Sequence, residues 1–167
     1  NVIPMSVKLR GTIRTLDPDV TRLIFASHAL MDELFPAESN HHMMPEELAA
    51  PNVHFFAARR DGRTIGCGAV AEKDGYGEIK SVFVDPEARG SGAAQAIMRM
   101  LEDHARKLKL PLLRLETGDR LHAARKLYAN MGFEERGPYG EYVLDPLSVY
   151  MEKRLAPAET RDPATEA

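Results

Sequence analysis

The sequence contains a single cysteine and lacks any long apolar run. One thiol can form neither an internal disulfide nor a metal site of several thiolates, so Cys67 suits a reducing compartment. A membrane helix needs about 18 or more apolar residues, and no segment approaches that length. Residues 1–10 also lack the basic and then apolar layout of a secretory signal. We therefore expect a cytoplasmic protein that binds no membrane.

A basic excess is missing as well. Lysine and arginine number 22 against 25 acidic residues, which gives a net charge of −3. This balance argues against nucleic acid as the partner. Histidine, aspartate and glutamate show no convincing metal-ligand spacing, so we expect no metal. The 167 residues suit a single domain over 1–155, followed by a tail over 156–167 whose composition predicts disorder.

Hydrophobic periodicity predicts strands and helices that alternate along the chain. Strands are expected over residues 6–15, 54–60, 64–72, 77–84, 112–116, 133–136 and 149–153. Helices are expected over residues 18–34, 93–108 and 122–131, with a short one after Pro45. A strand, helix and strand in succession over 77–116 require parallel pairing, whereas the short turns elsewhere require antiparallel pairing. The sequence thus predicts a mixed sheet.

The helix over 93–108 shows the clearest amphipathic pattern. Ile97, Leu101 and Ala105 fall on one apolar stripe. Glu102 and Arg106 are assigned to the outward face, where an acid four residues before a base supports a helix. We therefore expect Glu102 to be solvent-exposed.

A glycine-rich segment between a predicted strand and this helix carries the most chemical information. Gly90 and Gly92 allow a ligand to approach the backbone, and the helix behind them offers unpaired N–H groups. This pattern favours a phosphate or pyrophosphate site. The segment lacks the Gly-Lys-Ser/Thr ending of a P-loop and the third glycine of a dinucleotide fingerprint. From the glycines alone, a plain strand-to-helix turn is the alternative.

Three motifs carry a resemblance to a known superfamily. The run Arg89-Gly90-Ser91-Gly92-Ala93-Ala94 resembles the pyrophosphate loop of the GNAT superfamily of acetyl-CoA-dependent N-acetyltransferases. Residues 77–84 are similar to its central strand, and residues 124–133 to its helix with a following Gly-Phe pair. The resemblance covers about residues 6–155, and shorter runs at 36–39, 66–69, 115–118 and 145–149 are similar to small bacterial members.

The resemblance implies a fold and a co-substrate. The fold is α/β and GNAT-type, a mixed twisted sheet of six to seven strands with helices on both faces. The co-substrate is acetyl-CoA, and no metal is implied. The residues with an implied role in binding it are Val82, Phe83 and Val84 (backbone to the pantetheine arm), Arg89, Gly90, Ser91, Gly92, Ala93 and Ala94 (N–H groups to the pyrophosphate), and Thr117, His122 and Ala124 (beside the arm). The family often has an asparagine near Thr117 and Gly118, so this chain departs from the pattern there.

Acetyl transfer also needs an acid and a base. Tyr128 matches the tyrosine often proposed to protonate the departing thiolate, although its place on an apolar stripe also suits core packing alone. An attacking amine must be neutral, so a base or a water chain must take its proton. Glu78 is the first candidate, with Glu116 and His42 as alternatives, and Glu78 could instead be a solvent-facing strand residue. A backbone N–H near Val82 is expected at the thioester oxygen.

These features predict an N-acetyltransferase that acts on a primary amine of a small molecule, by direct attack in a ternary complex. Residues 37–53 and 137–145 are expected to form the acceptor pocket. Their acidic residues fit a cationic acceptor, but Arg120, Arg125 and the histidines could equally receive a carboxylate. The alternatives are a non-catalytic module that binds or senses acyl-CoA, and an enzyme that acts on a protein amine. A homodimer is common in the family and is expected only on that ground.

Overall fold

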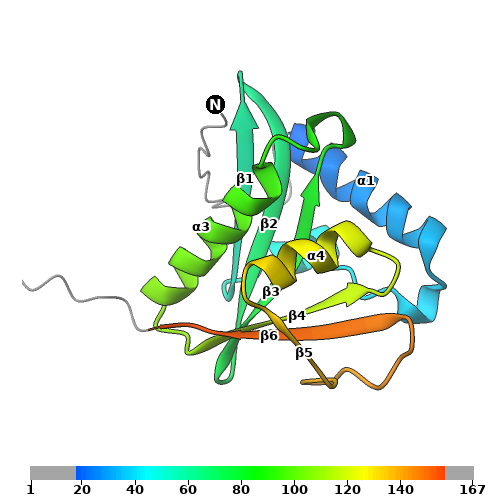
Figure 1. Cartoon of the computed structure of the whole chain (residues 1–167). Helices are drawn as coiled ribbons and strands as arrows, with labels where there is room; N and C mark the ends of the chain where they lie inside the picture. The colour runs from blue at the N-terminus through cyan, green and yellow to red at the C-terminus, as the bar shows by residue number, and fades with distance from the viewer. Residues whose placement is uncertain (1–17, 157–167) are drawn as a thin grey trace, which may run out of the picture.

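The computed structural model describes residues 18–156, which form a six-stranded mixed sheet with helices packed against it (Figure 1). The strands are β1 (Val53–Arg60), β2 (Arg63–Lys73), β3 (Tyr76–Val84), β4 (Leu112–Gly118), β5 (Glu134–Arg136) and β6 (Ser148–Arg154). The α-helices are α1 (Pro18–Leu34), α2 (Pro45–Leu48), α3 (Ala93–Lys107) and α4 (His122–Asn130). Short 3-10 helices cover Ala37–Ser39 and Pro86–Ala88. Within this part of the chain, no helix has the length and apolar character that a membrane crossing needs.

Each of these strands and long helices was predicted to within two residues at either end. The predicted strand over 6–15 and the tail from 157 onward lie outside the described residues. The sheet order is β1-β2-β3-β4-β6-β5. Two antiparallel hairpins turn at Asp61-Gly62 and Asp74-Gly75, while β3 and β4 pair in parallel across the α3 crossover. This confirms the mixed sheet.

Helices cover both faces of the sheet, as predicted. On one face, α3 and α4 contribute Ile97, Leu101 and Tyr128 to a core of fully or nearly buried side chains. On the opposite face, α1 contributes Val20 and Leu23 to a second core. The alternation of side chains along each strand divides the sheet residues between the two cores.

The C-terminal end of α4 fixes the position of Tyr128. Gly132 has φ +92°, a left-handed conformation that suits glycine and ends the helix. The backbone N–H of Phe133 then donates to the carbonyl oxygen of Tyr128 at 3.0 Å. The ring of Phe133 is buried and packs edge-on against the Tyr128 ring, with 6.0 Å between centroids. The Gly132-Phe133 pair therefore fixes the position of the Tyr128 side chain.

Glu102 is not solvent-exposed, and that prediction was wrong. Only 5% of its surface is accessible, and both carboxylate oxygens accept from Nζ of Lys153 on β6, at 2.8 and 3.0 Å. Arg106 lies 3.4 Å from the same carboxylate. Period and charge predict an outward-facing Glu102, and only the tertiary fold brings Lys153 of β6 to its carboxylate.

This pair yields a prediction about stability. The substitution Lys153→Met removes the closest cation from a buried carboxylate. Because an unpaired buried charge is costly, we expect the free energy of unfolding to fall by about 2 to 3 kcal/mol, with Arg106 offsetting part of the loss. Urea denaturation measures the change, and Lys107→Met on the exposed side of α3 is the matched control. A change within about 0.5 kcal/mol of that control would show that the pair contributes little.

Candidate active site

The parallel strands β3 and β4 pair over only two residue positions. Gly77 is opposite Leu113 and Glu78 is opposite Arg114, and the pairing ends there. In Figure 1, β3 runs upright while β4 heads away from it across the molecule. The facing edges of residues 79–84 and 115–118 therefore carry backbone N–H and C=O groups that do not pair with each other. Such an edge can receive an extended ligand as an added strand.

A β-bulge lies on β3 just past the point of separation. Cys67 is opposite Phe83 and Ala69 is opposite Lys80, so β3 holds one extra residue between these pairs. Ser81 has φ +56°, an uncommon conformation for a residue that is not glycine. Bulges re-aim side chains and interrupt the ladder beside active sites. The bulge thus falls in the segment where the resemblance expects a backbone N–H to face the thioester.

The segment 89–94 forms an open turn that leads directly into α3. Gly90 and Gly92 have φ values of +78° and +81°, which side chains rarely adopt, and a Cβ on either would meet nothing within 4 Å. The hydroxyl of Ser91 donates to the carbonyl oxygen of Ala88 at 2.5 Å and closes the turn. The first N–H groups of α3 have no partner within the helix and lie at the positive end of its dipole. This exposed cradle fits a pyrophosphate.

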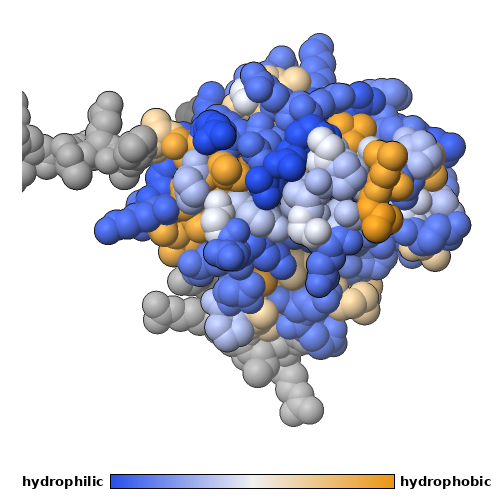
Figure 2. All heavy atoms as spheres, turned by 90° about the horizontal axis from the view of Figure 1, so that it is seen from below, coloured by the Kyte–Doolittle hydropathy of each residue, from blue (hydrophilic) through white to orange (hydrophobic). Residues whose placement is uncertain are grey.

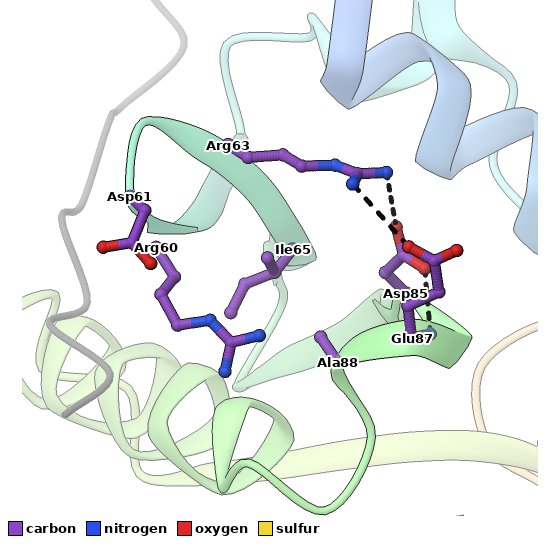
Figure 3. A pocket seen from close by; sticks show the side chains of 7 residues that line it. All are labelled: Arg60, Asp61, Arg63, Ile65, Asp85, Glu87 and Ala88. Atoms are coloured by element: carbon purple, nitrogen blue, oxygen red, sulfur yellow. Dashed lines mark hydrogen bonds and ion pairs between the residues drawn. The ribbon is translucent and has the colours of Figure 1, made fainter.

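Asp85 holds the start of this turn in place (Figure 3). Its carboxylate accepts from the backbone N–H of Glu87 at 3.1 Å and from Arg22 of α1 at 3.1 Å. Arg63 of β2 reaches toward the same carboxylate at 3.8 Å and toward Glu87 at 3.6 Å. The Glu87 N–H, and then the Arg22 guanidinium, lower the pKa of Asp85. Through Asp85, the turn at residues 89–94, which we call the anion turn, is therefore linked to both α1 and the β1–β2 hairpin.

Tyr128 lies on the α3 and α4 side of the sheet and is 7% exposed. Burial raises the pKa of its hydroxyl to about 12, and the charge of Glu116 adds to the effect. The O–H is therefore protonated at neutral pH. Tyr128 also packs in the core, so both roles expected for it from the sequence are compatible with its position.

The opposite face of β3 and β4 gathers the charged residues of the site. Alternation along the strands places Glu78 and Lys80 of β3 on the same face as Glu116 of β4. Glu78 is 6% exposed, so the alternative of a solvent-facing residue was wrong. The hydroxyl of Ser148 donates to Glu116 at 2.8 Å. Burial raises the pKa of Glu116, and the nearby charge of Glu78 acts in the same direction. We call this surface the acceptor face.

Two segments, residues 36–44 and 137–147, cover the acceptor face, and we call them the roof segments. The Ser39 hydroxyl donates to Asp145 at 2.6 Å and joins the two segments to each other. The ammonium of Lys80 donates to the carbonyl oxygen of His41 at 2.7 Å and to the Tyr142 hydroxyl at 3.0 Å. Both segments are thus tied to β3 through one lysine.

The remaining predicted residues lie along the α4 side of the separated strands. Thr117 is buried near the end of β4, Ala124 packs against the core, and His122 is exposed at the start of α4. Gly118 makes room for Phe35, because a Cβ there would come within 2.2 Å of the phenyl ring. This close contact explains a glycine beside the position where the family often has an asparagine.

Sequence reasoning missed several residues of the acceptor face. Lys80 could have been found, because it follows Glu78 by two residues on the same strand. The aromatic residues Tyr139, Tyr142 and Tyr150 meet there only through the tertiary fold. Burial, and then the charge of Glu78, raises the pKa of both Tyr139 and Tyr142.

The two adjacent histidines of the first roof segment have different surroundings. His42 stacks on His28 of α1, with 4.0 Å between ring centroids. His41 instead lies edge-on to Tyr142 at 5.0 Å, and its charge acts on Glu116. Of the two histidines, His41 therefore lies nearer to the charged residues of β3 and β4, whereas His42, the alternative base expected from the sequence, packs against α1. Among residues 18–156, no three side chains of metal-binding type come together.

Comparison with known proteins agrees with this geometry. Residues 25–133 match the family described as the acetyltransferase (GNAT) family. The chain is 44% identical over 142 residues to an IAA acetyltransferase of Azospirillum brasilense, a match that covers 84% of this chain and 93% of that one. It is also 36% identical over 128 residues to the N-acetyltransferase YsnE of Bacillus subtilis, across 75% and 85% of the two chains.

Solved structures show the same fold. A Klebsiella pneumoniae protein assigned as an acyl-CoA N-acyltransferase superposes with a TM-score of 0.76 and 33% identity, over 93% of this chain and 100% of that chain. The PaiA N-acetyltransferase of Thermoplasma acidophilum, in complex with coenzyme A, gives a TM-score of 0.69 over 90% and 99% of the two chains. At 15% identity, that second likeness shows the fold alone. Family, sequence relatives and fold agree: this chain belongs to the GNAT family of acetyltransferases and is an acyltransferase.

Proposed function

We propose that this chain transfers an acetyl group from acetyl-CoA to the primary amine of a small molecule, by direct attack in a ternary complex. The observation that carries the proposal is the separation of β3 and β4 immediately after Glu78 and Arg114. It leaves one strand edge free for the pantetheine arm, in line with the exposed anion turn at residues 89–94. The largely buried side chain of Tyr128 lies on one side of the sheet and the acceptor face on the other.

Acetyl-CoA supplies a thioester carbonyl carbon as the electrophile. We expect the backbone groups of residues 82–84 that lie on the edge away from β2 to pair with the arm and to stabilise negative charge that develops on the carbonyl oxygen. The Tyr128 O–H is the proposed donor to the leaving thiolate, since it is protonated at neutral pH. In this proposal, the backbone of residues 82–84 holds the arm and stabilises charge, and the Tyr128 hydroxyl donates a proton.

Glu78 is the proposed base that takes the proton of the attacking amine. It is buried on the acceptor face, beside the hydroxyls of Tyr139 and Tyr142. Glu116 is a second candidate, since burial raises its pKa and its charge acts on Tyr128 across the separated strands. A base is most effective when its pKa lies near the working pH.

The roof segments favour a small acceptor over a protein. They bury Glu78, the group that the amine must approach. The end of the molecule in Figure 2 is mostly hydrophilic, and its apolar patches are separate from one another. An enzyme of this family that acts on a protein amine is the alternative.

The first test is thermal unfolding with and without acetyl-CoA, followed by an assay for free coenzyme A with a panel of amines. At about 100 times the dissociation constant, binding adds about 2.7 kcal/mol to the free energy of unfolding. For a chain of this size, the midpoint should rise by about 5 to 11 °C. Adenosine alone is the control and should give no such shift. No shift with acetyl-CoA, together with no release of coenzyme A, would contradict the proposal.

The substitution Tyr128→Phe tests the proposed acid. It removes one hydroxyl and keeps the ring that packs on Phe133. We expect kcat to fall at least about tenfold, because the leaving thiolate loses its donor. The dissociation constant of acetyl-CoA should be nearly unchanged, and steady-state kinetics with calorimetry measures both. Phe133→Leu, which loosens the same packing but removes no hydroxyl, is the control. An unchanged kcat in Tyr128→Phe would leave the tyrosine with packing alone.

The pair Glu78→Gln and Glu116→Gln tests the proposed base. Each substitution replaces a carboxylate by an amide of the same shape and removes the proton acceptor. We expect Glu78→Gln to lower kcat by at least about tenfold and to abolish the fall in kcat at acid pH, because that fall reports protonation of the base. Glu116→Gln should retain the acid limb. If instead only Glu116→Gln loses it, Glu116 is the base.

A further inference from the structure

Two arginines at the edge of the acceptor face share one carboxylate. Arg114 donates to Glu152 at 2.7 Å, and Arg136 of β5 bonds to the same carboxylate. The hydrogen bonds from Arg114 and Arg136, and the charges of both guanidinium groups, lower the pKa of Glu152. This network is satisfied within the protein and leaves little reason for a ligand to bind there.

Lys80 is different. Its ammonium is half-buried and donates only to two neutral oxygens, the His41 carbonyl and the Tyr142 hydroxyl. Among the ion pairs of residues 18–156, none involves Lys80. An ammonium has three donors, so one N–H is still available. No carboxylate is hydrogen-bonded to this half-buried ammonium, so it attracts an anion more strongly than a fully exposed lysine does.

The position of Lys80 relates this charge to the reaction. It lies two residues beyond Glu78 on the same face of β3, so the Cα atoms of the two residues are about 7 Å apart. It also lies level with Glu116 across the separated strands, and its charge acts on that carboxylate. This part of the acceptor face thus holds two carboxylates, Glu78 and Glu116, that can attract a ligand's ammonium group. It also holds one ammonium, that of Lys80, which can attract a ligand's anionic group.

We propose that Lys80 binds a carboxylate carried by the acceptor, and that the acceptor is therefore an amino acid or a similar amine with an acidic group. This inference rests on the proposed function. The acceptor's amine nitrogen forms the new bond to the acetyl carbon, and the thioester C–S bond breaks. The amine gives its proton to the base, Tyr128 protonates the thiolate, and the acceptor carboxylate takes no part in bond changes. It serves as the handle by which Lys80 orients the amine.

The same charge disfavours a polyamine. A second ammonium on the acceptor would approach Lys80, and like charges in a partly buried site repel. The acidic residues of the acceptor face, taken alone, would have suited a polyamine. Lys80 thus decides between the cationic and the carboxylate-bearing acceptors that the sequence leaves open.

The experiment compares acceptors that differ only in the acidic group. Methionine, methioninamide and 3-(methylthio)propylamine form one set, and lysine and cadaverine form a second. With wild-type protein and acetyl-CoA, we expect kcat/KM to be at least about tenfold higher for the carboxylate form in at least one set, mainly through a lower KM. Spermidine should be the weaker acceptor relative to that amino acid.

The variants Lys80→Met and Lys80→Arg complete the test. We expect Lys80→Met to lower the ratio of kcat/KM for the amino acid over its amide at least about tenfold, and Lys80→Arg to restore part of it because the charge is kept. Lys107→Met, at the exposed end of α3, removes a lysine charge far from the acceptor face and should leave the ratio as in wild type. Acetyl-CoA should raise the unfolding midpoint of all variants equally, which shows that the fold and the cofactor site are intact.

The outcomes separate this inference from the proposed function. If no amine of any kind releases coenzyme A, the proposed function fails. If amines are acetylated but the amide or the diamine is used as well as the amino acid, the carboxylate site is wrong and the function stands. If the preference exists but Lys80→Met does not change it, Lys80 is not the group that binds the carboxylate.

Discussion

The parting of β3 from β4 after Glu78 and Arg114 is the constraint on which the site depends. A parallel pair that continued to Val84 would satisfy its backbone groups internally and leave no edge for a ligand. The bulge at Ser81 interrupts the other side of β3 at the same level. Backbone N–H and C=O groups that would normally pair within a sheet can therefore bind a ligand in the middle of the molecule.

The separation also brings the two faces of the sheet into electrostatic contact. Tyr128 packs in the α3 and α4 core, whereas Glu116 lies on the acceptor face, and yet the charge of Glu116 helps to raise the pKa of Tyr128. In a continuous sheet, packed strands would keep these groups apart. Here the charge of a candidate base acts on the proposed acid from the opposite side of the sheet. Acid and base chemistry needs such proximity with different surroundings for each group.

The loops complete the acceptor side. The roof segments lie far apart in sequence, but Ser39 joins Asp145, and Lys80 ties both segments to β3. In the proposed function, the sheet and helices supply what is common to acetyl transfer, and these loops line the acceptor side. A few side chains on two irregular segments can change the acceptor without disturbing the anion turn at residues 89–94 or its anchor, Asp85.

The sequence by itself determined the order and ends of the elements, the mixed pairing, the anion turn and the place of Tyr128, because these follow from local periodicity, glycine positions and short motifs. It could not determine that Glu102 is buried beneath Lys153, or that Tyr139 and Tyr142 stand over Glu78, because these contacts join segments up to 64 residues apart. It offered His42 as an alternative base, whereas the tertiary structure stacks His42 on His28 and sets His41 beside Tyr142. Neighbouring residues determine helices, strands and turns, but burial and charge pairing arise only when distant segments of the chain come into contact.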